Sequence, residues 1–246
     1  HLMMQNEAAN SSNGQGCTNN GNNNMINQQS SILQTFCWVI LSLSSATPAF
    51  SLDFNFTFTP ESNQADKDAF EQAGAFWSSK LNDNVTLNMD VGTAALGSGI
   101  LAQAGSTKGT ISYSNFFNAL TADASTGNDA SAVSSLSNGS SFDMLINRTA
   151  NNPNGSGSAT AYLDNDGDAN NSNIYINSAN AKALGFTYDG TDASITFSNE
   201  FTWDYDSSNG IDSGTFDFVG VAIHEIGHAL GFVSGVDILD GNSPPV

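Results

Sequence analysis

The run Leu52–Thr59 alternates apolar and polar side chains, and it constrains how the folded part of this chain can begin. Such alternation is typical of a strand with one buried face. Apolar residues then recur at helical spacing over 65–81, and Thr59-Pro60-Glu61 predicts the cap and first turn of that helix. A second alternating set spans 85–91. A strand, a helix and a strand in this order predict an α+β fold.

The signals along the middle of the chain predict shorter elements. Glycine is frequent over 92–105, and Gly97-Ser98-Gly99 is expected to be a flexible loop. The predicted elements are helices over 115–121, 130–136 and 179–184 and strands over 142–146, 174–176 and 195–197. The strand over 195–197 is expected to be the last, and Gly185 is expected to end the helix before it.

The first fifty residues differ in composition from the rest of the chain. They hold one charged side chain, Glu7, and residues 1–30 contain 13 Asn or Gln. A polar tract of this kind has no apolar face to bury, so residues 1–30 are expected to be disordered. Residues 31–50 hold an apolar run too short to cross a bilayer and then small residues, which is typical of a secretory signal peptide. A buried strand is the alternative, because no Lys or Arg precedes the run.

Basic side chains are scarce throughout the chain. Five Lys and Arg stand against 24 Asp and Glu, which gives a formal charge of −19. So few cations cannot form the phosphate-neutralising face of a nucleic-acid binder, and they do not favour an anionic membrane surface. Both cysteines, Cys17 and Cys37, lie in or before the signal-like segment, so no disulfide or thiol catalysis is expected in the mature chain. The composition predicts a soluble, secreted protein without stable membrane insertion.

The residues that carry chemistry form one HExxH motif, His224-Glu225-Ile226-Gly227-His228. On a helix, residues four apart lie on one face, so His224 and His228 can direct ring nitrogens at one tetrahedral zinc ion. Zinc lowers the pKa of a bound water and polarises a scissile carbonyl. Glu225 is placed to accept the proton of that water and pass it to the leaving amine. The motif therefore predicts peptide hydrolysis with zinc as cofactor.

The residues around the motif favour a metal-binding helix over its alternative, a buried histidine pair in a core helix. Asp217 is a suitable N-cap, and Gly231 stands where a helix can end with a positive φ. The whole chain has three histidines, and two of them are His224 and His228. This arrangement makes a purely structural pair the weaker interpretation.

HEIGHALGFVSGVD, preceded by DFVGVA, resembles the zinc helix of metzincin-type metallopeptidases. It is similar to a group of secreted bacterial metalloproteases, and HALGF is also similar to leishmanolysin. The resemblance covers Leu52 to the C-terminus and implies a catalytic domain over 51–246, in which a twisted sheet with packed helices ends in the zinc-binding helix. It implies that His224 and His228 are zinc ligands, that Glu225 is the general base and that Gly231 turns the chain back towards the metal.

The third zinc ligand departs from the family pattern. In HExxHxxGxxH/D proteins it lies three residues after the glycine, where this chain has Ser234, a poor zinc ligand. One interpretation is that Asp237 or, less favourably, Asp240 completes the site. In the other, the ligand and the family's methionine turn lie beyond Val246, since no methionine follows Met144. We favour an incomplete, truncated domain over ligation by Asp237, because zinc peptidases usually have three protein ligands.

Two acidic clusters raise the question of a second metal site. The first is Asp164, Asp166 and Asp168, and the second is Asp204, Asp206 and Asp212. Oxygen ligands at alternate positions are typical of calcium loops, but Ala169 and Tyr175 stand where an EF-hand loop has glycine and glutamate. Calcium binding outside an EF-hand and a solvated acidic loop are both retained as alternatives. The second cluster can also be a turn capped by its own side chains.

These patterns together predict a secreted zinc endopeptidase that acts on protein or peptide substrates. The alternative is a non-catalytic secreted module, calcium-binding and adhesive, with a degenerate or truncated zinc helix. A glycosidase is less favoured, because sequence spacing does not show the separation of two carboxylates that its chemistry requires. The patterns do not indicate an oligomeric state.

Overall fold

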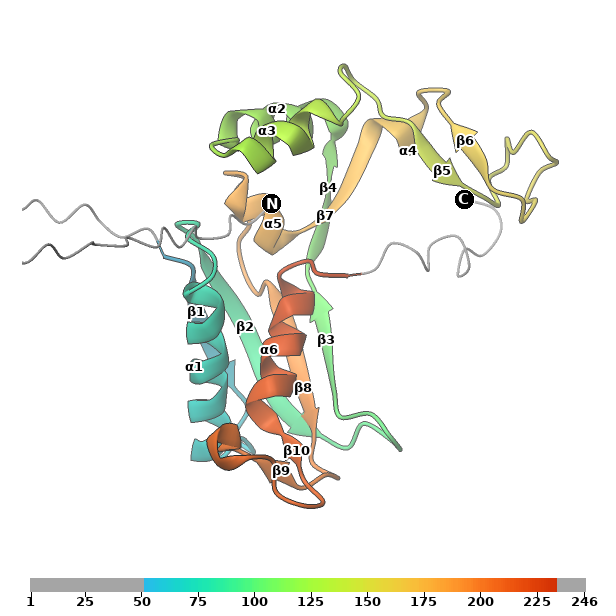
Figure 1. Ribbon diagram of the computed structural model, residues 1–246. Helices are drawn as coiled ribbons and strands as arrows, with labels where there is room; N and C mark the ends of the chain where they lie inside the picture. Colours follow the sequence, from blue (N-terminus) through green and yellow to red (C-terminus); the bar gives the residue numbers. More distant parts are fainter. Residues whose placement is uncertain (1–50, 234–246) are drawn as a thin grey trace, which may run out of the picture. The chain divides into compact units, whose positions relative to one another are not determined.

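The strands of the main sheet are parallel except at one edge. In the computed structural model, which describes residues 51–233, four strands follow the order β1-β2-β8-β3 (Figure 1). They are β1 (Asp53–Phe58), β2 (Thr86–Ala94), β8 (Ala193–Ser198) and β3 (Ala102–Ser106). The first three pair in parallel, and β3 pairs antiparallel with β8. The predicted disordered tract 1–30 and the predicted signal segment 31–50 lie outside the described residues.

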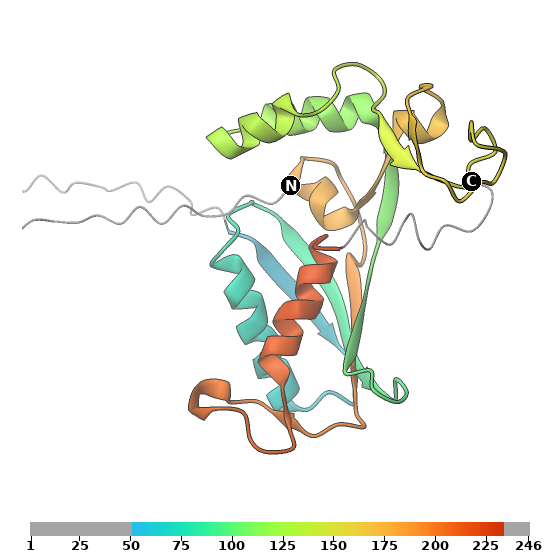
Figure 2. The ribbon, with the colours of Figure 1, turned by 45° about the vertical axis from the view of Figure 1, so that its right-hand side comes forward.

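One face of this sheet carries the apolar core. Helices α1 (Gln64–Ser78) and α6 (Phe218–Ala229) lie side by side over this face in both views (Figure 1, Figure 2). The ring of Phe70 in α1 lies 5.2 Å from that of Phe197 in β8 and 5.6 Å from that of Phe218 in α6. Burying an aromatic side chain stabilises a fold by about 1.5–3 kcal/mol. These three rings therefore hold both helices against the sheet.

The opposite face of the sheet is polar. Thr57, Asp90 and Ser194 stand in register on β1, β2 and β8, and all three are exposed. A sheet with one buried and one exposed face needs alternating apolar and polar residues. The strands predicted from alternation at Leu52–Thr59 and over 85–91 are confirmed, although β2 continues to Ala94.

The segment between β3 and β8 contains a second group of short elements. These are β4 (Lys108–Ser112), α2 (Tyr113–Asp123), α3 (Gly127–Ser134), β5 (Met144–Ile146), β6 (Tyr162–Asp164), α4 (Ala169–Ser172), β7 (Asn173–Asn177) and α5 (Ser178–Ala183). β4 pairs with β7 and β5 with β6, both antiparallel. Leu120, Ile176 and Leu184 are buried at the centre of a separate apolar cluster in this group.

The fold is a mixed α+β fold, as the sequence predicts. After β8 come β9 (Trp203–Asp204), a 3-10 turn (Ser207–Asn209) and β10 (Phe216–Asp217), which leads directly into α6. Within residues 51–233, no helix has the length and apolar character needed to cross a membrane.

The predicted start of the first helix is wrong. α1 begins at Gln64, after Asn63, and not in the turn at Thr59-Pro60-Glu61. Asn63 and Asp66 form a capping box, in which the Asn63 side chain accepts a hydrogen bond from the Asp66 N–H (3.0 Å) and Asp66 accepts one from the Asn63 N–H (2.8 Å). Two backbone donors are satisfied reciprocally at this point, so the helix begins here.

Local caps also place the starts of two shorter helices earlier than the sequence predicts. α2 starts at Tyr113, two residues before the prediction, because Ser112 caps it. α3 starts at Gly127, three residues before the prediction, because Thr126 and Asp129 form a second capping box. The sequence predicts both helices, but their first residues depend on these capping hydrogen bonds.

Several strands lack a clear signal in the sequence. The glycine-rich stretch 92–105 contains the end of β2 and most of β3, and β8 is not the last strand, since β9 and β10 follow. β3 reads Ala-Gln-Ala-Gly-Ser and has no β-branched residue, so its strand conformation comes from pairing with β8. The strand expected over 142–146 is limited to Met144–Ile146, because the Phe142 N–H bonds to the Asn171 carbonyl instead.

Tyr205 connects the loop after β9 to the start of α1. Its hydroxyl donates a hydrogen bond to Asp66 Oδ1 (2.6 Å), the acid of the capping box. Burial, together with the hydrogen bond and the negative charge of Asp66, raises the pKa of Tyr205 from 10.0 to about 12. The folded protein thus holds this proton more tightly than the unfolded chain, so Tyr205 contributes stability that is full below pH 10 and is lost as the pH rises through about 12.

We expect Tyr205→Phe to lower the free energy of unfolding at about pH 8 by about 1–2 kcal/mol, because a hydrogen bond to a charged group is lost. The difference between the variant and the parent protein should shrink between pH 10 and 12, because Tyr205 ionises from about pH 10 in the unfolded parent chain and only near pH 12 in the folded one. Urea unfolding of both proteins from about pH 8 to pH 12 measures this difference in the free energy of unfolding. A difference that stays constant with pH would contradict the assignment.

Candidate metal centre

Helix α6 presents the HExxH motif as the sequence predicts. Asp217 is the N-cap, and its Oδ1 accepts a hydrogen bond from the Gly220 N–H (3.0 Å). Phe218, Ala222 and Ile226 recur at helical spacing and are buried against the sheet. This apolar stripe fixes the rotation of the helix, and the two histidines project from another side of it.

The two histidine rings converge on one point. The Nε2 atoms of His224 and His228 lie 3.0 Å apart, and the ring planes cross at 84°. Two nitrogens bound to one tetrahedral zinc ion lie about 3.3–3.4 Å apart, given Zn–N bonds of about 2.0–2.1 Å. A change of a few tenths of an ångström would let both rings share such an ion. The donor pair thus fits zinc.

The second nitrogen of His228 is held by the main chain. Nδ1 of His228 lies 2.8 Å from the carbonyl oxygen of Phe232. A carbonyl oxygen only accepts hydrogen bonds, so Nδ1 carries the proton and Nε2 of neutral His228 carries a lone pair. Metal-binding histidines commonly make such a second contact, because it fixes the tautomer and the ring orientation.

The turn after α6 supplies that carbonyl. The Gly231 N–H bonds to the His228 carbonyl (3.0 Å) and the Phe232 N–H to the Gly227 carbonyl (3.0 Å), which is a Schellman motif. Gly231 has φ +97°, as the sequence analysis expects of a glycine that ends the helix. Asn177 adds a cap from outside, since its Nδ2 donates to the Ala229 carbonyl (3.1 Å).

Glu225 lies between the two histidines in sequence but on the buried side of the helix. It is 7% exposed, in contrast to the exposed ring of His224. Burial raises the pKa of Glu225, and the positive charges of His224 and His228 oppose this shift in part. A carboxyl group with a raised pKa, next to two imidazoles, is a candidate to accept a proton in catalysis.

No third ligand for the two imidazoles is found among the described residues. Between residues 51 and 233, no Cys, Asp, Glu or further His joins His224 and His228 in a metal-binding group. The proposed ligand Asp237, the weaker candidate Asp240 and Ser234 all lie outside the described residues. Ligation by Asp237 therefore stays a prediction.

The acidic side chains of Asp164, Asp166 and Asp168 do come together, with one oxygen of each within 4.8 Å of the others. Each also accepts a protein hydrogen bond: Asp164 from the Asn170 side chain (3.0 Å), Asp166 from the Asp168 N–H (3.1 Å) and Asp168 from the Asn170 N–H (3.0 Å). The geometry is thus compatible with both interpretations, a cation site and a loop capped by its own side chains.

The second acidic cluster acts as a set of turn caps. Asp204 accepts hydrogen bonds from the Asp206 N–H (2.9 Å) and the Asp212 N–H (2.8 Å), and Asp206 accepts one from the Ser208 N–H (3.2 Å). These bonds order the loop between β9 and β10, which precedes α6. They agree with the capped-turn interpretation of this cluster.

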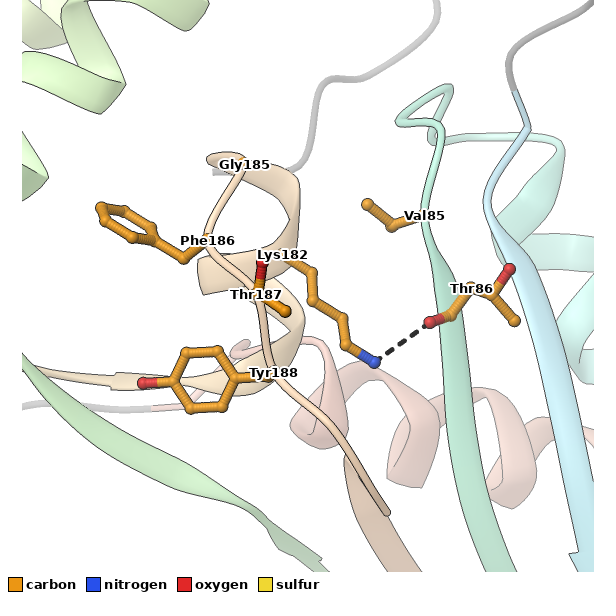
Figure 3. A pocket seen from close by; sticks show the side chains of 7 residues that line it. All are labelled: Val85, Thr86, Lys182, Gly185, Phe186, Thr187 and Tyr188. Atoms are coloured by element: carbon orange, nitrogen blue, oxygen red, sulfur yellow. Dashed lines mark hydrogen bonds between the residues drawn. The ribbon is translucent and has the colours of Figure 1, made fainter.

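A hollow beside α5 contains none of the candidate site residues. Figure 3 shows Lys182 extended across it towards Thr86, whose carbonyl accepts a hydrogen bond from Nζ (3.2 Å). The same Nζ lies 2.6 Å from Asp192 Oδ2, so the lysine charge is already matched by a buried carboxylate. The pair connects α5 to the main sheet, which is a structural role.

Three groups that contact the candidate site are not predicted from the sequence. They are the carbonyl of Phe232, the amide of Asn177 and the indole of Trp77, whose Nε1 donates to the Ile223 carbonyl (2.9 Å). The glycine at 231 could have predicted the turn that presents the Phe232 carbonyl. Trp77 and Asn177 are far from the motif in sequence, and nothing local in their surroundings connects them with it.

Comparison of the chain with family models, curated proteins and solved structures found no match.

We expect Gly231→Ala to lower the free energy of unfolding by about 2 kcal/mol, because φ +97° is strained for alanine and the new Cβ would meet the side-chain amides of Asn177 and Asn180. Displacement of the Phe232 carbonyl should also weaken zinc binding. Urea unfolding and zinc titration of the full chain measure the two effects.

Gly214→Ala is the matched control. Gly214 has φ +85°, and a Cβ there would meet no atom within 4 Å. This variant should lose stability through backbone strain and keep the zinc affinity of the parent. Equal zinc affinities for both variants would contradict a role of the turn in metal binding.

Proposed function

We propose that this protein is a secreted zinc-dependent endopeptidase of metzincin-like architecture. The observation that carries the proposal is the arrangement at the end of α6, where two imidazole nitrogens lie 3.0 Å apart and the carbonyl of Phe232 fixes the tautomer of one of them. The 3.0 Å distance is also that of a hydrogen bond between the rings, but a purely structural pair does not need the exposed ring of His224. A shared metal ion explains the convergence of the rings and this exposure together.

Each residue of the motif has a role in this proposal. His224 and His228 hold the metal through Nε2, and zinc when bound would polarise a scissile carbonyl and acidify a water molecule. Glu225 accepts the proton of that water on its carboxylate and then donates it to the nitrogen of the leaving amine. Its buried position raises the pKa of the carboxyl group, which favours the first transfer, the uptake of the proton.

A substrate class and a location of the protein accompany this assignment. The substrate is a protein or peptide, nucleic acid is not a partner because only five basic residues are present, and secretion follows from the signal-like segment 31–50. Asp237 remains a candidate for the third ligand. The catalytic domain spans 51–246 in this proposal.

A non-catalytic secreted module that binds calcium is the second candidate. The proximity of Asp164, Asp166 and Asp168 favours it, because three carboxylate oxygens within 4.8 Å of one another form a plausible cation site. Calcium that raises the melting temperature of the parent protein and not of Asp166→Asn, in a chain that binds no zinc and cleaves no casein, would support this candidate over the peptidase.

We expect Glu225→Gln to keep the zinc content of the parent and to lose casein hydrolysis by about a hundredfold or more, because the proton carrier is removed while both imidazoles remain. The measurement combines elemental analysis of the purified full chain with a casein assay of the same samples. His224→Ala should lose both zinc and activity.

Glu71→Gln is the matched control. Glu71 is an exposed glutamate on α1, and the substitution removes one negative charge without changing α6. Its zinc content and activity should equal those of the parent. A parent chain that holds zinc and cleaves casein as fast as Glu225→Gln would overturn the catalytic role of Glu225, and a parent that binds no zinc would overturn the proposal as a whole.

A further inference from the structure

The indole of Trp77, near the end of α1, makes three contacts with the end of α6. Its Nε1 donates a hydrogen bond to the Ile223 carbonyl (2.9 Å). Its ring stacks on the ring of Phe232, with centroids 5.3 Å apart and planes inclined by 23°. Its Cζ2 would lie 3.2 Å from a Cβ at Gly227. One side chain thus contacts the last two turns of the helix and the turn after it.

Glycine at position 227 makes this packing feasible. Gly227 is the residue whose carbonyl closes the Schellman motif, and in that motif the residue after the αL glycine usually packs on an apolar side chain near this position. Here that partner has no side chain. The indole of Trp77 occupies the space and supplies the apolar contact for Phe232 from another helix.

We propose that Trp77 is a positioning residue for the metal centre, because it fixes Phe232 and thereby the carbonyl that holds His228 in its metal-binding tautomer. The inference rests on the proposed function and deepens it. The Phe232 side chain is 50% exposed, so few other contacts restrain it. The route from the indole to the imidazole has two steps, the stacked ring of Phe232 and the 2.8 Å hydrogen bond from Nδ1 of His228.

A positioning role of Trp77 and simple support of the fold affect different properties of the protein. Loss of general support would lower the stability of α6 and leave the chemistry of His228 in the folded protein unaltered. Loss of positioning frees the Phe232 carbonyl, so that His228 samples both neutral tautomers and offers its lone pair on Nε2 for only part of the time. Metal affinity then falls, as it does when partners of metal-binding histidines are removed.

Trp203 offers a matched control. It is also half-buried, its Nε1 also donates to a main-chain carbonyl, that of Ser198 (3.0 Å), and its ring packs on Phe218 at 5.3 Å. It therefore contacts the same helix at the opposite end. Removing either indole costs a ring contact near one end of α6, and only Trp77 lies beside Phe232.

The experiment compares the full chain with Trp77→Ala, Trp77→Phe and Trp203→Ala. Zinc alone is the probe, and its dissociation constant should rise about 10-fold or more in Trp77→Ala, less in Trp77→Phe, and change less than about twofold in Trp203→Ala. Nitrogen chemical shifts of the metal-free proteins report the tautomer of His228. Hydrogen exchange reports the Phe232 N–H bonded to the Gly227 carbonyl.

We expect the metal-free parent and Trp203→Ala to hold His228 with its proton on Nδ1, and Trp77→Ala to show a mixture of tautomers and faster exchange at Phe232. A single tautomer and an unchanged zinc affinity in Trp77→Ala would overturn the proposal, and so would equal losses in Trp203→Ala. A parent chain that binds no zinc would instead refute the proposed function, and the tautomer and exchange measurements would still decide the role of Trp77.

Discussion

The packing of α6 against the sheet through Phe218 is the interaction on which the rest of this structure depends. The ring of Phe218 lies 4.3 Å from that of Phe197, 5.6 Å from that of Phe70 and 4.9 Å from that of Tyr205. It follows directly after the N-cap Asp217, so the start of the helix is fixed in position and in rotation. Because an α-helix is a rigid repeat, this single anchor determines the direction in which His224 and His228 project from it, six and ten residues later.

The far end of the same helix is held in a different way. There the directional contacts are hydrogen bonds to main-chain groups from Trp77 and Asn177 and a turn that requires glycine at 231, beside the stacking of Trp77 on Phe232. The ring contacts of Phe218 at the start of the helix chiefly stabilise the fold. The hydrogen bonds at its far end chiefly set the geometry of the candidate site. Apolar contacts are tolerant of small shifts, whereas a hydrogen bond to a ring nitrogen is directional, and it is found where the orientation of His228 matters.

Sequence patterns predict the parts of this fold that depend on local periodicity. Alternation identifies β1 and β2, helical spacing identifies α1 and α6, and the HExxH motif identifies the imidazole pair. Patterns fail where a remote partner determines the conformation. β3 is a strand because β8 pairs with it, and α1 begins at Gln64 because Asn63 and Asp66 cap each other. The carbonyl of Phe232 is a main-chain group, so the residue type does not indicate its role. Trp77 contributes only through the packing of α1 beside the end of α6, which no local pattern predicts.

The distance along the chain between these partners has a consequence for how the molecule folds. Trp77 and Ile223 are separated by 146 residues, and the parallel pairing of β2 with β8 brings together Asn88 and Asp192, which are 104 residues apart. Contacts of such high sequence separation form slowly, because a long loop must close before they contribute. The end of α6 therefore acquires its arrangement only after the sheet has assembled. The contacts that orient His228 are therefore gained late in folding, and a chain still emerging from synthesis does not yet have them.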